Sequence, residues 1–253
     1  METSAYLDRI KYNKTPRPDV ETLYGLHLAH MLTVPFENLD IELKRPIRIT
    51  RQAIYDKIVT NNRGGFCYEL NGLFAWLLQE IGFDVNYLNA RVFKPTGELS
   101  IPFGHLTLLV QIPGQQDRWL ADVGFGDSFT QPLPFEVDKK HVQGLRAYRV
   151  KKHSDGYVMS QKNYERIWEN RYLFDLQPHT FPDEFIAGCE YHQTSPNSSF
   201  TRGSIISKAT PEGRISLEWN RLILTSHGKK TQQEVTNKEE YRFLLKQHFG
   251  ITL

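Results

Sequence analysis

Three residues of this chain have side chains and neighbours that could support covalent catalysis, namely Cys67, His105 and Asp122. Cys67 lies in the stretch RGGFCYELN, after two glycines and at the start of a helical pattern. The free N–H groups of a first helical turn favour a thiolate, and Arg63, four residues earlier, adds positive charge. Free cysteine is also among the most buried residue types, so a structural role in the core is the alternative.

A catalytic thiol needs a base and, usually, a group that orients the base. His105 follows Gly104 and opens the apolar run HLTLLVQI, and Asp122 ends a second apolar run in LADVGFG. If the two runs are adjacent antiparallel strands, these ends could meet. A strand-end histidine can equally be a hydrogen-bonded structural residue, and Asp122 can be a turn residue before Gly124 and Gly126. Spacing alone leaves the Cys-His-Asp set as a candidate.

The second cysteine, Cys189, falls on the core-facing side of a helix predicted over residues 182 to 192, where we expect a structural thiol. The two cysteines do not form a CxxC motif, and we expect both to be free thiols. The histidines are scattered along the chain, a spacing that is not typical of metal ligands. We therefore expect no metal site, which makes a non-catalytic metal-binding module the weakest of the alternatives.

The element that must position Cys67 is a helix. Residues 1 to about 85 have helical periodicity, and Asp19 and Thr50 are suited to cap two helices in this region. A third helix is predicted to begin at or just after Cys67, since apolar residues repeat at helical spacing from there to Gly82.

The elements that must position His105 and Asp122 are strands. From about 85 to 175 the pattern changes to short strands separated by Gly, Pro, Asp and Asn, which predicts an antiparallel meander or small barrel: VNYLNARVF, HLTLLVQI, RWLADVG, RAYRVKK, GYVMSQ and RIWENRYLFD. After the helix at 182 to 192, we predict two strands, GSIISKAT and RISLEWNRLILTS, joined by the turn PEG. The helix KEEYRFLLKQHF closes the chain.

Composition favours a small-molecule partner. The 253 residues are 40% hydrophobic and 24% charged, and 31 basic against 29 acidic residues leave a net charge of +2. Because the sequence contains no long run of like charge, we do not expect a surface that binds nucleic acid or membranes. The N-terminus carries charges where a signal peptide needs an apolar core, and runs such as GLFAWLL are too short to span a bilayer. We expect one packed body in the cytoplasm.

Four motifs in this order resemble the arylamine N-acetyltransferase family: VPFENLD at 34 to 40, RGGFCYELN around Cys67, FGHLTLLV around His105 and LADVGFGD around Asp122. The resemblance spans residues 5 to 205, and the cysteine segment is its most specific part. It implies an α+β fold with a cysteine-protease-like Cys-His-Asp triad, in three domains: an N-terminal helical bundle (1–85) carrying the cysteine, a central antiparallel β-barrel (86–190) carrying His and Asp, and a C-terminal α/β lid (191–253).

The resemblance also implies an activity. Members of this family use acetyl-coenzyme A as co-substrate and acetylate arylamines, arylhydrazines or N-hydroxyarylamines by a ping-pong mechanism through an acetyl-cysteine. By position, Cys67, His105 and Asp122 match the family triad. No metal, nucleic acid or membrane is part of this chemistry.

Further site residues follow from the resemblance alone. Phe36, Phe125 and, through SPNSSF, Phe200 match positions that line the acceptor pocket. Gly126 falls where the backbone of the family approaches the coenzyme. In addition, Arg63, Glu37 and Asp40 match an ion-pair cluster beneath the cysteine.

Other Cys-His-Asp enzymes are the rival interpretation. In papain-like proteases the histidine lies far downstream of the cysteine, whereas here Cys67 and His105 are 38 positions apart and Asp122 follows 17 positions later. Transglutaminase-like acyltransferases share the order of the three residues and are the alternative, together with a cysteine hydrolase that uses the same triad.

Overall fold

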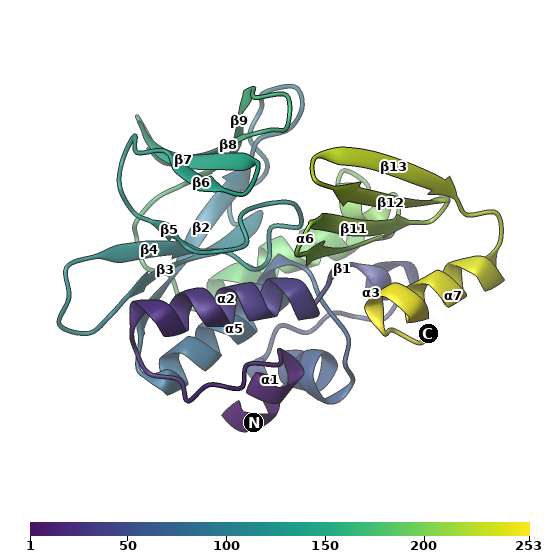
Figure 1. The fold of residues 1–253 in the computed structure, drawn as a ribbon, viewed down its shortest axis with the longest axis horizontal. Helices are drawn as coiled ribbons and strands as arrows, with labels where there is room; N and C mark the ends of the chain where they lie inside the picture. The colour runs from purple at the N-terminus through teal and green to yellow at the C-terminus, as the bar shows by residue number, and fades with distance from the viewer.

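The computed structural model describes all residues, 1–253, and contains two antiparallel sheets and a group of helices (Figure 1). The first helices and a short strand are α1 (Thr3–Arg9), α2 (Val20–Thr33), β1 (Phe36–Glu37), α3 (Leu39–Glu42), α4 (Arg51–Tyr55) with a following π-helical turn (Asp56–Thr60), and α5 (Cys67–Ile81). None of the helices combines the length and apolar character needed to cross a bilayer.

Local signals account for the ends of these helices. The Asp19 carboxylate accepts a hydrogen bond from the Thr22 N–H (2.8 Å) and caps α2, and Thr50 caps α4. α5 begins at Cys67 and ends before Gly82, whose φ of 105° is the left-handed conformation that favours glycine. The three predicted helix starts and the predicted end at Gly82 are confirmed.

The eight-stranded sheet curves into a barrel whose strands β2 and β3 pack on α5. Its strand order is β5-β4-β3-β2-β9-β8-β7-β6. The strands are β2 (Asp84–Val92), β3 (His105–Gln111), β4 (Arg118–Ala121), β5 (Leu133–Pro134), β6 (His141–Gln143), β7 (Arg146–His153), β8 (Gly156–Lys162) and β9 (Trp168–Phe174). Gln143 in the last strand bonds the backbone of Thr130 and Gln131, just before β5, so the two sheet edges meet. The predicted antiparallel barrel is confirmed.

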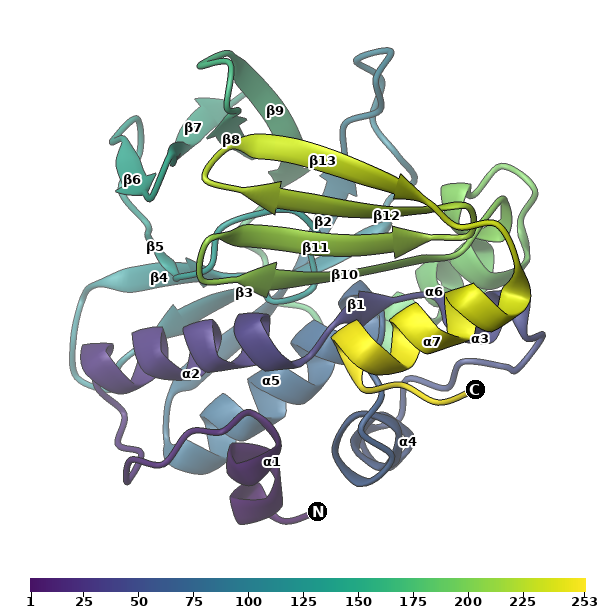
Figure 2. The same ribbon diagram turned by 45° about the vertical axis from the view of Figure 1, so that its right-hand side comes forward.

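The five-stranded sheet has the order β1-β10-β11-β12-β13, with β10 (Ile205–Thr210), β11 (Gly213–Glu218), β12 (Arg221–Ser226), β13 (Lys229–Glu234) and the closing helix α7 (Lys238–Phe249). Figure 2 shows its long strands side by side, with α7 packed against them through a shared apolar cluster. The prediction of one strand over RISLEWNRLILTS was wrong, because a turn at Trp219 and Asn220 divides it into β11 and β12. The strand β13 was not predicted from the sequence.

The segment between the two sheets packs on the helices. A 3₁₀ turn (Asp183–Phe185) leads into α6 (Ile186–Thr194), and a second such turn spans Ser199–Thr201. The Cys189 side chain is buried in the same core cluster as α5, in agreement with its predicted structural role. The division into domains at residues 85 and 190 stays a prediction, since β1 pairs with β10 and links the first region to the last.

α5 is the central element of the molecule. Every residue from Cys67 to Leu78 is buried, with helices on one side and the strands β2 and β3 on the other. A helix buried all round is held by packing rather than by intrinsic helix propensity. The direction of α5, and therefore the place of its first residue, is fixed by the surrounding core.

The chain approaches α5 through a tight contact at Gly64. Gly65 pairs with Phe36, and a Cβ added at Gly64 would overlap the Pro35 carbonyl oxygen.

We predict that Gly64→Ala lowers the free energy of unfolding by about 3 kcal/mol, because backbone atoms would have to move. Urea unfolding measures this. The matched control is Gly203→Ala, where an added Cβ meets nothing within 4 Å and the change should stay within about 0.5 kcal/mol. Equal effects of the two substitutions would contradict the prediction.

Candidate active site

His105 and Asp122 form a buried ion pair at the strand ends where the sequence predicted that they could meet. His105 is the first residue of β3, and Asp122 follows the last residue of the neighbouring strand β4. His105 Nε2 lies 2.7 Å from Asp122 Oδ2, with side-chain exposures of 3% and 0%. A carboxylate without access to water must be paired, and the imidazole supplies the pair.

The side chain of Cys67 interacts with the same imidazole. Cys67 is the first residue of α5, is 3% exposed and lines one cavity together with His105. Burial lowers the pKa of His105, but the charge and hydrogen bond of Asp122 and the interaction with Cys67 outweigh it and raise that pKa to about 10. The imidazole therefore stays protonated near neutral pH and can hold a thiolate.

Asp122 receives further hydrogen bonds from α5 and from its own loop. Asn71 Nδ2 donates to Asp122 Oδ1 (2.8 Å), and the Gly124 N–H donates to the same oxygen (3.0 Å). Burial raises the pKa of Asp122, but His105, Asn71 and Gly124 outweigh it and lower that pKa below its usual value. Asn71 was not among the residues predicted for the site. Its position four residues after Cys67, on the same helix face, was the signal available.

A second residue that sequence reasoning missed is His27 on α2. Its Nδ1 donates to the Thr130 carbonyl (2.9 Å), which requires the proton on Nδ1 and leaves Nε2 to accept the Asp122 N–H (3.2 Å). Burial lowers the pKa of His27 to about 4, so the ring is neutral and can play both roles. The His27 imidazole thus forms a hydrogen bond with each end of the loop from 122 to 130.

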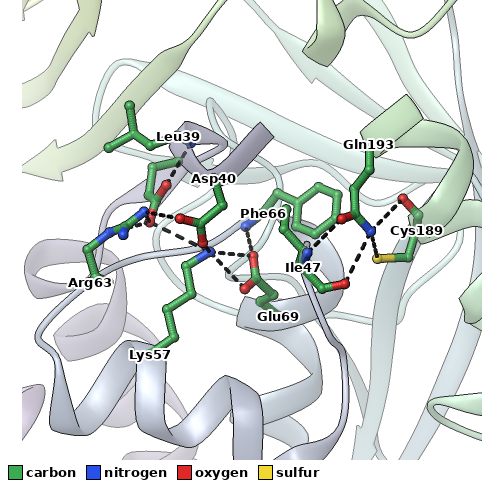
Figure 3. A network of polar contacts seen from close by, with 10 residues as sticks. Leu39, Asp40, Ile47, Lys57, Arg63, Phe66, Glu69, Cys189 and Gln193 are labelled. Carbon is green, nitrogen blue, oxygen red and sulfur yellow. Dashed lines mark hydrogen bonds and ion pairs between the residues drawn. The ribbon is translucent and has the colours of Figure 1, made fainter. Parts of the chain in front are cut away.

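An ion cluster lies beneath the start of α5 (Figure 3). Arg63 pairs with Glu37 (2.8 Å) and Asp40 (3.2 Å), and Lys57 pairs with Asp40 and Glu69 (2.8 Å each). Glu69 Oε2 also accepts the N–H of the residue that precedes Cys67, which caps the helix. Burial raises the pKa of Glu69 to about 7 even though Lys57 opposes it.

The role of Arg63 differs from the one expected. The sequence suggested a cation that favours the Cys67 thiolate, but the guanidinium is bound by two carboxylates. These carboxylates largely neutralise its charge. The implied ion-pair set of Arg63, Glu37 and Asp40 exists, and it fixes the chain where α5 starts.

The other predicted site residues border the same cavity, which has a volume of about 1150 Å³: Phe36, Phe125, Phe200 and Gly126. The ring of Phe125 lies 5.1 Å from that of His105, and the rings of Phe36 and Phe200 are 5.9 Å apart (centroid to centroid). A Cβ on Gly126 would make only ordinary contact with Phe36 at 3.6 Å. At Gly124, by contrast, a Cβ would lie 2.8 Å from Cys67 Cα. Only glycine at position 124 therefore lets this loop pass so close to the start of α5.

Comparisons with known proteins agree with this geometry. A family model described as N-acetyltransferase matches residues 19–253. An arylamine N-acetyltransferase of Mycolicibacterium smegmatis is 32% identical over 257 residues, covering 100% of this chain and 93% of that protein. The chain belongs to the arylamine N-acetyltransferase family.

Two further members of the family are informative. An arylamine N-acetyltransferase / N-hydroxyarylamine O-acetyltransferase of Salmonella typhimurium is 32% identical, covering 98% of this chain and 88% of that protein. The structure of Mycobacterium marinum arylamine N-acetyltransferase in complex with CoA superposes with a TM-score of 0.92 at 30% identity, covering 99% of this chain and 93% of that one. The predicted family and fold class are confirmed.

The raised pKa of His105 has a consequence for stability. The folded protein keeps the proton up to a pH of about 10, while an unfolded histidine loses it near 6.5. The stabilisation from the His105–Asp122 pair is therefore fully present below pH 6.5 and is lost as the pH rises through about 10.

We predict that His105→Gln costs most stability at pH 6 and progressively less toward pH 10. Urea unfolding of Cys67→Ser and of Cys67→Ser/His105→Gln at several pH values measures this without titration of the Cys67 thiol. A stability difference between the two proteins that does not change with pH would contradict the assignment.

Proposed function

We propose that this chain transfers an acetyl group from acetyl-coenzyme A to arylamines, arylhydrazines or N-hydroxyarylamines, with Cys67 as nucleophile, His105 as base and Asp122 as the group that orients the base. The observation that carries the proposal is the buried His105–Asp122 pair beside a thiol in a cavity partly lined by aromatic rings. Membership of the arylamine N-acetyltransferase family supports the same chemistry.

In the first half-reaction, Cys67 Sγ attacks the thioester carbonyl of acetyl-coenzyme A. The bond between the acetyl carbon and the sulfur of the coenzyme breaks, and coenzyme A leaves as a thiol with the proton held by His105. Cys67 is the first residue of α5, so its backbone N–H has no partner within the helix and is suited to stabilise the tetrahedral oxyanion.

In the second half-reaction, the acceptor amine attacks the carbonyl of acetyl-Cys67 and His105 takes its proton. The acetylated amine then leaves and Cys67 regains its thiolate. Because coenzyme A departs before the acceptor enters, the kinetics are ping-pong. Water must be kept from the acetyl-enzyme, and the buried thiol supports this.

The acceptor ring is proposed to lie among Phe36, Phe125 and Phe200, whose apolar faces suit a flat aromatic group. Gly126, which leaves the cavity wall without a side chain, is proposed to let the coenzyme approach the backbone.

The partners under this proposal are the coenzyme and the small acceptor, without nucleic acid or membrane. Both cysteines are free, which suits a reducing compartment, and the cytoplasm is the proposed location.

We predict that acetyl-coenzyme A alone adds one acetyl group to the protein, and that the group is found on the peptide containing Cys67. Intact mass and peptide mapping measure this. Cys67→Ser should abolish the adduct. Cys189→Ser is the matched control and should keep it, because burial holds the pKa of the Cys189 thiol above its usual value and leaves that thiol inert. An adduct on Cys189, or turnover without any adduct, would refute the proposed nucleophile.

A further inference from the structure

The turn that leads into His105 is strained and is held by side chains from other elements. Phe103 has a φ of 56°, in the left-handed region that a residue with a bulky side chain rarely adopts. Its N–H donates to Asn89 Oδ1 (2.6 Å), and its carbonyl accepts a hydrogen bond from the Tyr68 hydroxyl (2.6 Å). The carbonyl of the next residue, Gly104, is held from α6.

His192 on α6 supplies this last hydrogen bond. Its Nε2 lies 2.9 Å from the carbonyl oxygen of Gly104, one residue before the proposed base. A carbonyl oxygen can only accept, so Nε2 carries the proton. Burial lowers the pKa of His192 below its usual value; the bond to Gly104 opposes this, and the charge of His105 adds to it. The ring is therefore neutral near pH 7, and Nδ1 is an acceptor.

The second ring nitrogen of His192 reaches the acceptor side of the cavity. Nδ1 lies 3.1 Å from Ser198 Oγ, so the hydroxyl donates to it. The same oxygen accepts the Phe200 N–H (3.2 Å) and caps the turn Ser199–Thr201. The rings of His192 and Phe200 also lie 5.1 Å apart, centroid to centroid, edge to face. The place of Phe200 therefore depends on His192 both directly and through Ser198.

His192 has no nitrogen left for a substrate. It borders the cavity but is only 8% exposed, and both ring nitrogens already have partners. A proton shuttle would need one of them free. The two hydrogen bonds end beside the proposed base and beside a proposed wall of the acceptor pocket, which favours a role in placing these two groups.

We propose that His192 is a positioning residue for both half-reactions, with Nε2 fixing the turn before His105 and Nδ1 fixing the ring of Phe200. This inference rests on the proposed function. Acetylation of Cys67 uses His105, whereas transfer to an aromatic acceptor uses both His105 and Phe200. The two nitrogens of one imidazole should therefore affect different steps.

Two substitutions separate the two nitrogens. In His192→Gln, the amide nitrogen can take the place of Nε2 and keep the bond to Gly104, but no atom replaces Nδ1. In His192→Asn, the amide oxygen can take the place of Nδ1 and keep the bond from Ser198, but the shorter side chain does not reach Gly104. Each variant loses one buried hydrogen bond, so a purely structural role would affect both alike. The matched control is His153→Asn, at the exposed end of β7 and outside the cavity.

The kinetic test forms acetyl-enzyme with acetyl-coenzyme A in a single turnover and discharges it with aniline or with hydrazine, which has no ring. We expect His192→Gln to be acetylated at the original rate and to need about fivefold more aniline for half-maximal discharge, the usual effect of losing one neutral hydrogen bond. Its discharge by hydrazine should not change. Ser198→Ala should show the same defect with aniline.

His192→Asn should instead slow acetylation and both discharges by about 10-fold, because the base is displaced. His153→Asn should change none of these rates. The same pattern of rates in His192→Gln and His192→Asn would overturn the proposal, as would an equal loss with hydrazine and aniline in His192→Gln.

Alkylation of Cys67 by iodoacetamide separates this inference from the proposed function, because it needs no acetyl transfer. A displaced His105 holds less thiolate, so we expect alkylation at pH 7 to slow by about 10-fold in His192→Asn and to stay unchanged in His192→Gln. If the unmodified protein forms no acetyl-enzyme, the proposed function fails, and alkylation still decides whether His192 positions His105. Equal alkylation rates in the two variants would refute it.

The tautomer of His192 tests the geometry in the unmodified protein, whether or not the variants fold. Nitrogen NMR of protein labelled at histidine should find the proton on Nε2 and none on Nδ1. A proton on Nδ1 alone would rule out the hydrogen bond to Gly104 and overturn the proposal.

Discussion

The burial of one carboxylate, that of Asp122, is the constraint on which the site depends. A carboxylate removed from water is costly unless every lone pair finds a donor, and Asp122 is fully buried. Its donors come from three elements: His105 at the start of β3, Asn71 on α5 and the N–H of Gly124 in its own loop. Helix, barrel and loop must all be in place before the charge is satisfied, so the His105–Asp122 ion pair forms only when the site has folded correctly.

The cavity around this pair is built from distant parts of the chain. Phe36 on β1 faces Phe200 after α6, while Phe125 comes from the loop that His27 holds at both ends. The pairing of β1 with β10 brings the second sheet to the cavity, where Arg214 on β11 reaches Asp127. Transfer through an acetyl-cysteine requires that coenzyme and acceptor reach the same sulfur in turn, and one cavity shared by the helices and both sheets meets that need.

Short-range features of this fold were predictable and long-range ones were not. Neighbouring residues were enough to predict the cap at Asp19, the helix end at Gly82 and the place of His105 at a strand end. The division of residues 213 to 226 into two strands was missed, because the turn at Trp219 and Asn220 contains no glycine or proline to mark it. The roles of Asn71 and His27 were also missed, since their contacts with Asp122 span 51 and 95 positions. For Asn71 the one local signal was its place four residues after Cys67, and for His27 there was none.

We propose that Asp122 acts by keeping His105 charged and by orienting its ring, and replacing Asp122 by asparagine removes that charge. Asparagine keeps the shape and part of the hydrogen bonding but removes the charge. Single-turnover acetylation of Cys67 by acetyl-coenzyme A should slow by about 10⁴-fold, the loss known for the same change in a serine-protease triad, while the circular dichroism spectrum stays that of the folded protein. Acetylation within about tenfold of the original rate, in a protein that remains folded, would contradict the account.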